Sequence, residues 1–197
     1  SYEASKKALE QYIGTVGQSH PKTAHALTSI GHYYFTQYQY DRAIRYLNEA
    51  LAILNTLNKR ASRLKAYILG RIASSYRELG VFDQARLFYT RADSNWLLVM
   101  GKHDSQRMSN LRNYATNELY AGAPEIALNI SKQVQGYYMA NPDRYGQAIA
   151  ENNVFLGRVY TDLGQLKTAD SLFNQSITRP LSNVESPTRT DINGFLG

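Results

Sequence analysis

One small residue returns at a constant spacing along the chain, and this spacing constrains the fold more than any other feature. Alanine occurs at four positions that are each 42 residues apart: Ala43, Ala85, Ala127 and Ala169. The apolar residues around each alanine recur in the same phase and at helical spacing. A simple helical bundle has no reason to keep a fixed period. The sequence therefore predicts a repeat array in which each unit packs against the next.

Residues 27–50 show what one unit contains. Apolar residues recur at helical spacing in two runs, and a polar turn separates the runs. Gly31 and Ala43 carry almost no side chain, so two antiparallel helices can approach closely there, while Tyr34 and Leu47 fill the space beside them. The stretch predicts an all-α fold built from antiparallel helix pairs.

This stretch resembles the tetratricopeptide pattern W-x2-L-G-x2-Y…A-x3-F, with Leu27 in place of Trp, Ile30 in place of Leu and Leu47 in place of Phe. The usual unit has about 34 residues. A period of 42 is similar to the repeats of kinesin light chains and their bacterial relatives. Residues 17–27 also resemble the G-x-x-H-P-x-x-A-x-x-L lead-in of those repeats. The resemblance implies a right-handed α-α superhelix, the TPR solenoid, in which the first helix of each pair lines a concave face.

The repeat frame predicts a single array over residues 1–197. The array opens with the second helix of a partial repeat at 1–16 and closes with a link and a truncated helix at 179–197. Between them we expect four repeats at about 22–57, 63–99, 105–139 and 147–178. First helices are expected at about 22–37, 63–79, 105–121 and 147–163, and second helices at about 40–57, 82–99, 124–139 and 166–178.

A few residues depart from the 42-residue repeat pattern. Gly80, Gly122 and Gly164 occupy one repeat position, where a left-handed turn suits glycine, but Tyr38 takes that position in the first unit. In the third unit, Glu118 stands where Tyr is expected and Ser131 stands where Phe is expected.

Composition excludes several classes of function. The chain has no cysteine, which rules out a thiol nucleophile, disulfides and zinc–thiolate sites. No run of about 18 apolar residues is present, so we expect no membrane span. The net charge of +6 favours acidic partners if it gathers on one surface. We expect a cytoplasmic location, with the bacterial periplasm, where cysteine-free proteins are also common, as the alternative.

The sequence carries no pattern of a catalytic or cofactor site. His20, His25 and His32 are close in sequence, but no carboxylate lies at ligand spacing, and there is no glycine-rich phosphate loop. We therefore expect no enzyme activity, no cofactor and no metal. Most of the 16 tyrosines are explained by the repeat frame, and the inward positions differ from unit to unit, so we expect no nucleic-acid partner.

The concave face implied by the resemblance is the candidate binding surface. Four of its arginines suit a carboxylate partner, because a guanidinium group can form two parallel hydrogen bonds with one carboxylate. The alternative is that these arginines only solvate the surface and pair with Glu78, Glu151 and Asp162. The residues predicted to bind a peptide are His32, Tyr67, Arg71, Arg77, Arg112, Asn113, Phe155 and Arg158.

The main functional hypothesis is a non-catalytic scaffold that binds a peptide or protein segment on this face, and the arginines favour an acidic one. The alternative is a regulatory or sensor arm of a larger bacterial protein, because similar arrays are often fused to caspase-like (CHAT) peptidase, nucleotide-binding or histidine-kinase domains. Binding of RNA or DNA is a third hypothesis, and it would show a steep dependence on salt. Terminal helices without a polar outer face would also permit end-to-end self-association.

Overall fold

A computed structural model describes residues 2–57 and 61–178, and within these ranges the regular structure is entirely α-helical. The helix bounds agree with the expected ranges to within one residue. The predicted all-α class is therefore confirmed. Contacts divide the chain into two compact units, Ser1–Ala121 and Gly122–Gly197. The single array over residues 1–197 stays a prediction, and the link and truncated helix expected at 179–197 lie outside the described residues.

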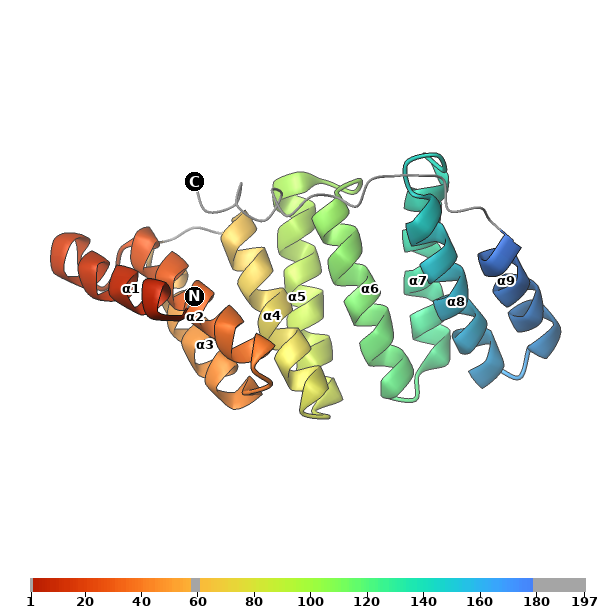
Figure 1. Ribbon diagram of the computed structural model, residues 1–197, viewed down its shortest axis with the longest axis horizontal. Coiled ribbons are helices and arrows are strands. Elements are labelled where there is room, and N and C mark those ends of the chain that lie inside the picture. The colour runs from red at the N-terminus through yellow and green to blue at the C-terminus, as the bar shows by residue number, and fades with distance from the viewer. Residues whose placement is uncertain (1, 58–60, 179–197) are drawn as a thin grey trace. The chain divides into compact units, whose positions relative to one another are not determined.

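The described residues of the first unit, 2–57 and 61–121, form six helices that follow one another in chain order (Figure 1). Each packs against the next, and α2 also contacts α4, which in turn contacts α6. The first helices of successive pairs therefore form one continuous layer, called the inner layer below. The six helices are α1 (Tyr2–Val16), α2 (Pro21–Thr36), α3 (Tyr40–Thr56), α4 (Arg63–Glu78), α5 (Phe82–Met100) and α6 (Ser105–Tyr120).

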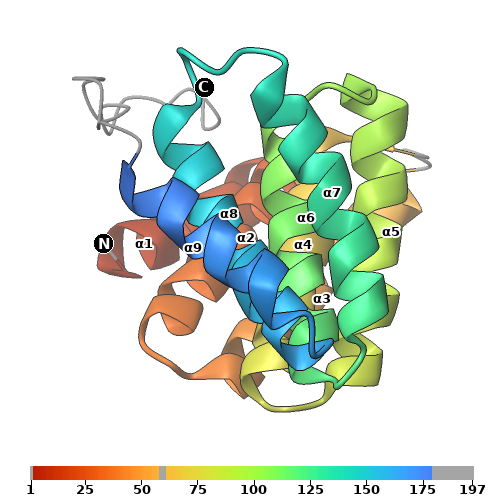
Figure 2. The same cartoon turned by 90° about the vertical axis from the view of Figure 1, so that its right-hand side faces the viewer.

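The second unit contains α7 (Pro124–Met139), α8 (Gly146–Asp162) and α9 (Leu166–Thr178). Helix α8 packs against both α7 and α9, and Figure 2 shows α8 and α9 side by side. Pro124 lies in the first turn of α7, where its missing N–H costs nothing because that group has no partner within the helix.

Two glycines let the helices of a pair approach closely. A Cβ atom built on Gly31 would lie 2.7 Å from Cγ of Leu47 and 3.3 Å from the carbonyl oxygen of Ala43. Gly157 occupies the same repeat position, and a Cβ atom there would lie 2.5 Å from Cε1 of Phe173. The close contact that the sequence predicted between Gly31, Ala43 and Leu47 is thus observed, and it fixes how α2 packs on α3.

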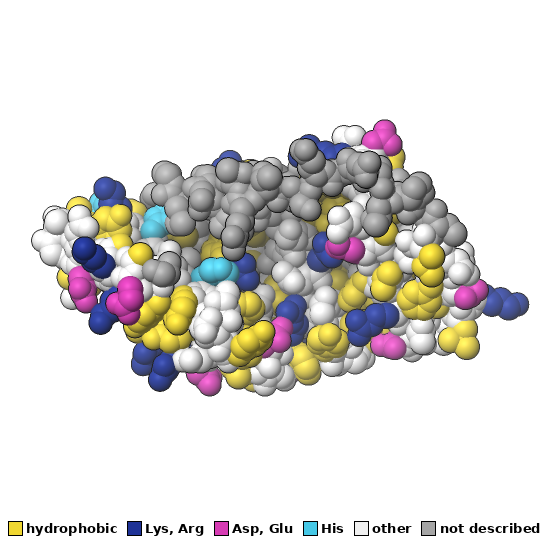
Figure 3. Space-filling model, in the orientation of Figure 1, with side chains coloured by type: hydrophobic (Ala, Val, Ile, Leu, Met, Phe, Trp, Pro, Cys, Tyr) yellow, Lys and Arg dark blue, Asp and Glu magenta, His cyan; other side chains and the backbone are white. Residues whose placement is uncertain are grey.

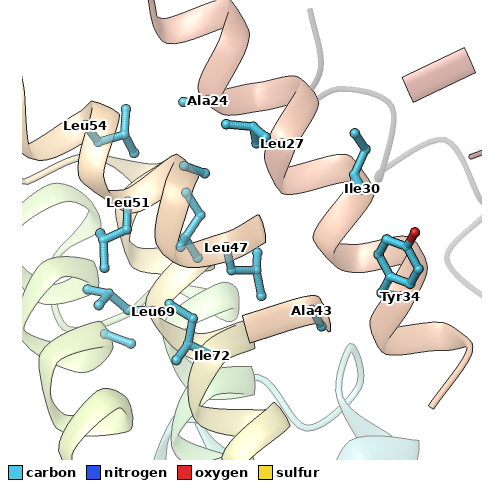
Figure 4. Close-up of a cluster of buried hydrophobic side chains, with 13 residues drawn as sticks. Ala24, Leu27, Ile30, Tyr34, Ala43, Leu47, Leu51, Leu54, Leu69 and Ile72 are labelled. Atoms are coloured by element: carbon cyan, nitrogen blue, oxygen red, sulfur yellow. The ribbon is translucent and has the colours of Figure 1, made fainter. Parts of the chain in front are cut away.

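The main core cluster of the first unit is built largely from α2, α3 and α4, with Ala92 added from α5. Side chains from these helices meet in one cluster, which Figure 4 shows. Tyr34 closes one end of the cluster, and its ring stacks on that of Tyr46 with the centroids 5.3 Å apart. The labelled members are Ala24, Leu27, Ile30, Tyr34, Ala43, Leu47, Leu51, Leu54, Leu69 and Ile72.

The turns inside the helix pairs follow the glycine pattern. Gly80, Gly122 and Gly164 have φ angles of 75°, 73° and 72°, and Tyr38 adopts the same left-handed conformation with φ 59°. A residue with a Cβ atom pays a steric cost in this region, so the turn at Tyr38 is strained compared with the other three. The sequence prediction of a less favourable first turn is confirmed.

Side chains at the helix starts set where the inner layer begins. His20 caps α2, since its Nδ1 accepts a hydrogen bond from the backbone N–H of Lys22 at 3.1 Å. Ser62 caps α4 through the N–H of Lys65, and Asp104 caps α6 through two backbone N–H groups. Each cap satisfies donors that the first turn of a helix leaves without a partner.

Candidate functional site

Arg71 lies at the centre of a group of aromatic side chains on the inner layer. Its guanidinium carbon lies 5.3 Å from the ring centroid of Phe35 on α2 and 5.1 Å from that of Tyr67 on α4. Its Nε donates a hydrogen bond to the hydroxyl of Tyr67 at 3.1 Å. These contacts fix the position of the charge, because cation–π attraction favours a guanidinium over a ring face. We call His32, Phe35, Tyr67 and Arg71 the α2–α4 cluster.

His32 belongs to the same cluster, three residues before Phe35 on α2. Its side chain is half-buried, and its Nδ1 is buried without a hydrogen-bond partner in the part of the chain that the structure describes. Burial lowers the pKa of His32, and the positive charge of Arg71 lowers it further. Both effects disfavour the imidazolium and favour the neutral ring.

Arg77 takes part in a second group of contacts, between α4, α5 and α6. Its Nη2 lies 2.6 Å from Oε1 of Glu78, and its Nη1 donates to the hydroxyl of Tyr89 at 3.3 Å. The same Nη1 donates to the backbone carbonyl of Asn113 at 3.4 Å, and the Tyr89 hydroxyl lies 3.0 Å from Oγ of Ser74. Arg77 pairs with Glu78, as the surface-pairing alternative expected, and a ligand at Arg77 would compete with that carboxylate.

The remaining predicted residues lie on two helices in different units. On α6, Arg112 is half-buried and Asn113 is exposed. On α8, Phe155 is half-buried and Arg158 is exposed. Of the eight predicted residues, the structure brings together His32, Tyr67 and Arg71 in the α2–α4 cluster, and it joins Arg77 to the backbone of Asn113. Phe155 and Arg158 belong to the second unit.

A buried ion pair that the repeat pattern does not predict joins α5 to α6. Glu118 is fully buried, and its carboxylate accepts hydrogen bonds from Nε of Arg86 at 3.0 and 2.9 Å, while Nη2 of Arg86 lies 2.8 Å away. Asn117 donates a further hydrogen bond to Oε1 of Glu118 at 3.0 Å. The hydrogen bond to Glu118 raises the pKa of Arg86. A carboxylate at an apolar repeat position was the available signal, because such a group needs a buried partner.

A second unpredicted ion pair also joins α5 to α6. Nε of Arg107 lies 2.7 Å from Oδ1 of Asp93, and Nη2 of Arg107 donates to Oδ2 at 3.1 Å. Nη1 of Arg107 donates to the carbonyl of Lys102 in the link before α6. Asp93 stands 42 residues after Leu51, a buried apolar residue, and this was the available signal, although it does not identify Arg107 as the partner.

The second unit has a polar network of neutral side chains between α7 and α8. Asn152 donates to Oε1 of Gln135 at 2.6 Å and to the carbonyl of Ser131 at 3.4 Å. Gln135 in turn donates to Oδ1 of Asn153 at 2.8 Å. Ser131, where an aromatic residue was expected, is buried beside this network. Amide pairs therefore replace apolar packing at this seam.

The described surfaces show few features of other site types. Figure 3 shows basic and acidic side chains interspersed over the face that it draws. Within residues 2–57 and 61–178, no group of three or more His, Asp or Glu side chains could hold a metal ion. In the same ranges, no helix has the length and apolar character needed to cross a bilayer.

Comparisons with known proteins agree with this architecture. Family models described as tetratricopeptide repeat match residues 1–56 and residues 150–182. The clustered mitochondria protein homolog of Candida albicans is 28% identical over 105 residues, which are 53% of this chain and 8% of that protein. The chain thus spans a small part of that relative's length.

Two solved structures resemble the fold at low sequence identity. The putative kinesin light chain TPR-like repeats of Podosopora anserina have a TM-score of 0.77 and 16% identity, covering 94% of this chain and 88% of that one. The Rap conjugation gene regulator of plasmid pLS20, solved in complex with a Phr peptide, has a TM-score of 0.65 and 17% identity, covering 89% of this chain and 47% of that one. At such identities the likeness shows the fold alone.

Proposed function

Because this chain is a tetratricopeptide-repeat protein with repeats like those of kinesin light chains, we propose that it is a non-catalytic scaffold that binds an extended peptide or protein segment on its inner layer. The contact of α2 with α4 and of α4 with α6 provides a continuous row of helices for such a segment. The Rap regulator, which has a similar fold, was solved with a peptide, and this supports the choice of a peptide partner.

The observation that supports the proposal most strongly is the set of contacts made by Arg71. This side chain is held by two rings and one hydroxyl, and no carboxylate of the described residues pairs with it. A positioned guanidinium loses little conformational freedom when it binds an anion, which favours binding. We therefore expect the bound segment to carry acidic side chains, in keeping with the net charge of +6.

Selection of peptides from a random displayed library tests the proposal. We expect enriched sequences that contain Asp or Glu and that bind, as synthetic peptides, at least about tenfold more weakly to the Arg71→Gln variant. Arg91→Gln is the matched control, because Arg91 is exposed on α5 and contacts the ring of Phe88. Equal binding to wild type and Arg71→Gln would contradict the proposal. Enrichment of nucleic acid from a parallel RNA library, with steep salt dependence, would favour a nucleic-acid partner instead.

The second candidate is a regulatory arm in a larger protein, such as a CHAT peptidase, nucleotide-binding or histidine-kinase fusion. The Candida relative favours it, because the matched repeats form only 8% of that polypeptide. Under this candidate the inner layer binds another domain of its own polypeptide. Binding of the separately expressed array to that domain, lost in Arg71→Gln, is the expected result, and the absence of such binding would argue against it.

A further inference from the structure

The α2–α4 cluster combines a fixed positive charge with a buried nitrogen that has no partner. Arg77 lies 2.6 Å from a carboxylate oxygen of Glu78, and Arg86 lies 2.8 Å from one of Glu118. Arg71 has aromatic neighbours in place of such a carboxylate. Its Nε is engaged by Tyr67, which leaves the two terminal amino groups as the donors for a ligand.

His32 lies one helical turn before Phe35 on α2, and the ring of Phe35 packs on Arg71. On α4, the charge of Arg71 acts on His32. On α1 and α3, titratable and charged side chains pack on the tyrosines that follow His32 on α2. Tyr2 contacts Tyr33 and Tyr34, Tyr46 stacks on Tyr34, and Arg42 lies over the Tyr34 ring.

From this arrangement we infer that the α2–α4 cluster binds one carboxylate of the peptide through Arg71 and His32 together, and that His32 takes up a proton as the carboxylate binds. The inference rests on the proposed function and adds to it an anchor and a dependence on pH. The two terminal amino groups of Arg71 match the two oxygens of a carboxylate, and a protonated imidazole supplies a further N–H donor.

The direction of the coupling follows from the charges. Without a ligand, protonation of His32 places a second positive charge beside Arg71, which is unfavourable. A bound carboxylate adds a negative charge next to both groups, so the pKa of His32 rises when the anion binds. By linkage, the affinity for the anion rises as the pH falls through the pKa that His32 has with the carboxylate bound. The affinity stops rising once the pH is below the pKa that His32 has without a ligand.

Acetate is the probe for the first test, because it is a single carboxylate without other recognition groups. The ring signals of the four histidines are titrated by NMR in acetate and in chloride at equal ionic strength, and His32 is assigned from a His32→Gln variant. We expect the pKa of His32 to be higher in acetate than in chloride. Acetate affinity, followed on the ring signals of Phe35 and Tyr67, should rise at least about fivefold between pH 7.5 and pH 5.5.

The Arg71→Gln variant distinguishes a real site from general salt effects. In this variant the pKa of His32 should rise without any acetate, because the neighbouring positive charge is gone, and the response to acetate should disappear. Circular dichroism confirms that the variant keeps its helices.

The outcomes separate the inference from the proposed function. If the NMR signals of the Phe35 and Tyr67 rings shift in acetate but the pKa of His32 does not change, the inference of proton uptake is overturned and carboxylate binding stands. No ring shifts in acetate would overturn the site itself. The library selection decides independently whether peptides bind elsewhere on the inner layer.

Discussion

In each of the first two repeats a tyrosine of the first helix stacks on an aromatic ring of the second helix of the same repeat. In the third repeat a glutamate takes that position and pairs with an arginine of the second repeat. Tyr34 stacks on Tyr46 with centroids 5.3 Å apart, and Tyr76 stacks on Phe88 at 5.6 Å. The next tyrosine position along the 42-residue period is Glu118, which is fully buried and bound by Arg86. The backbone of the repeat is thus compatible with two unlike ways of filling one position.

The two kinds of contact respond differently to the loss of one partner. An aromatic pair that loses one ring loses contact area and a modest stacking energy. A buried carboxylate that loses its cation keeps an uncompensated charge, which is far more costly. The contact between the second and third repeats should therefore be the most sensitive to single substitutions, and the aromatic pairs inside the first two repeats should be more tolerant.

Removal of Arg86 should give the largest effect. Arg86→Met leaves the carboxylate of Glu118 buried with only Asn117 as a partner, and we expect a loss of about 3 kcal/mol in the free energy of unfolding. This value lies at the low end for a broken buried pair because the Arg86 side chain is 37% exposed. Urea unfolding followed by circular dichroism measures it.

The double variant Arg86→Met/Glu118→Leu is the matched control for this prediction. It removes both charges and should recover most of the loss, since a well-packed apolar pair can replace a buried ion pair at little cost. A single variant that is as stable as wild type would show that water reaches Glu118 and that the ion pair is not desolvated.

The close approach of α8 to α9 in the second unit should give the next largest effect. In Gly157→Ala the new methyl group would meet three ring atoms of Phe173 at 2.5 to 2.9 Å, and we expect a loss of about 2 kcal/mol from overpacking. The exposed helical Gly136 has no atom within 4 Å of such a methyl group, so Gly136→Ala should stabilise by about 0.5 kcal/mol. Thermal unfolding of both variants tests this, and equal losses would refute the role given to Phe173.

The aromatic pair inside the second repeat should give the smallest effect. Tyr76→Leu removes the ring that stacks on Phe88 but keeps an apolar side chain, and we expect a loss of about 1 kcal/mol. Tyr76→Phe keeps the ring and should stay within about 0.5 kcal/mol of wild type. A loss as large as that of Arg86→Met would remove the distinction between the two kinds of contact.

Much of the fold could be predicted because the same packing recurs in several repeats. Gly31, Ala43 and Leu47 predict a close helix pair. The glycines at 80, 122 and 164 predict left-handed turns, and Tyr38 is recognisable as the exception to that pattern. These features are local or repeat at a fixed period, so one sequence contains enough copies to reveal them.

The site could be predicted only in part, because the partners of a charged side chain are set by contacts distant in sequence. Arg71 and Arg77 lie on the same helix and looked equivalent, yet one meets two rings and the other meets Glu78 and Tyr89. The pair of Glu118 with Arg86 spans two helices and replaces an apolar contact. The repeat frame marks Glu118 as an exception, but it does not identify the cation that compensates it.

A thermodynamic cycle between Arg71 and a carboxylate of a selected peptide tests the central claim most directly. Four affinities are measured by fluorescence anisotropy: wild type and Arg71→Gln, each with the acidic peptide and with its Glu-to-Gln analogue. We predict that either single change weakens binding about tenfold and that the second change then adds little, because both remove the same contact. Independent losses that multiply would contradict the claim and place the carboxylate at another part of the protein.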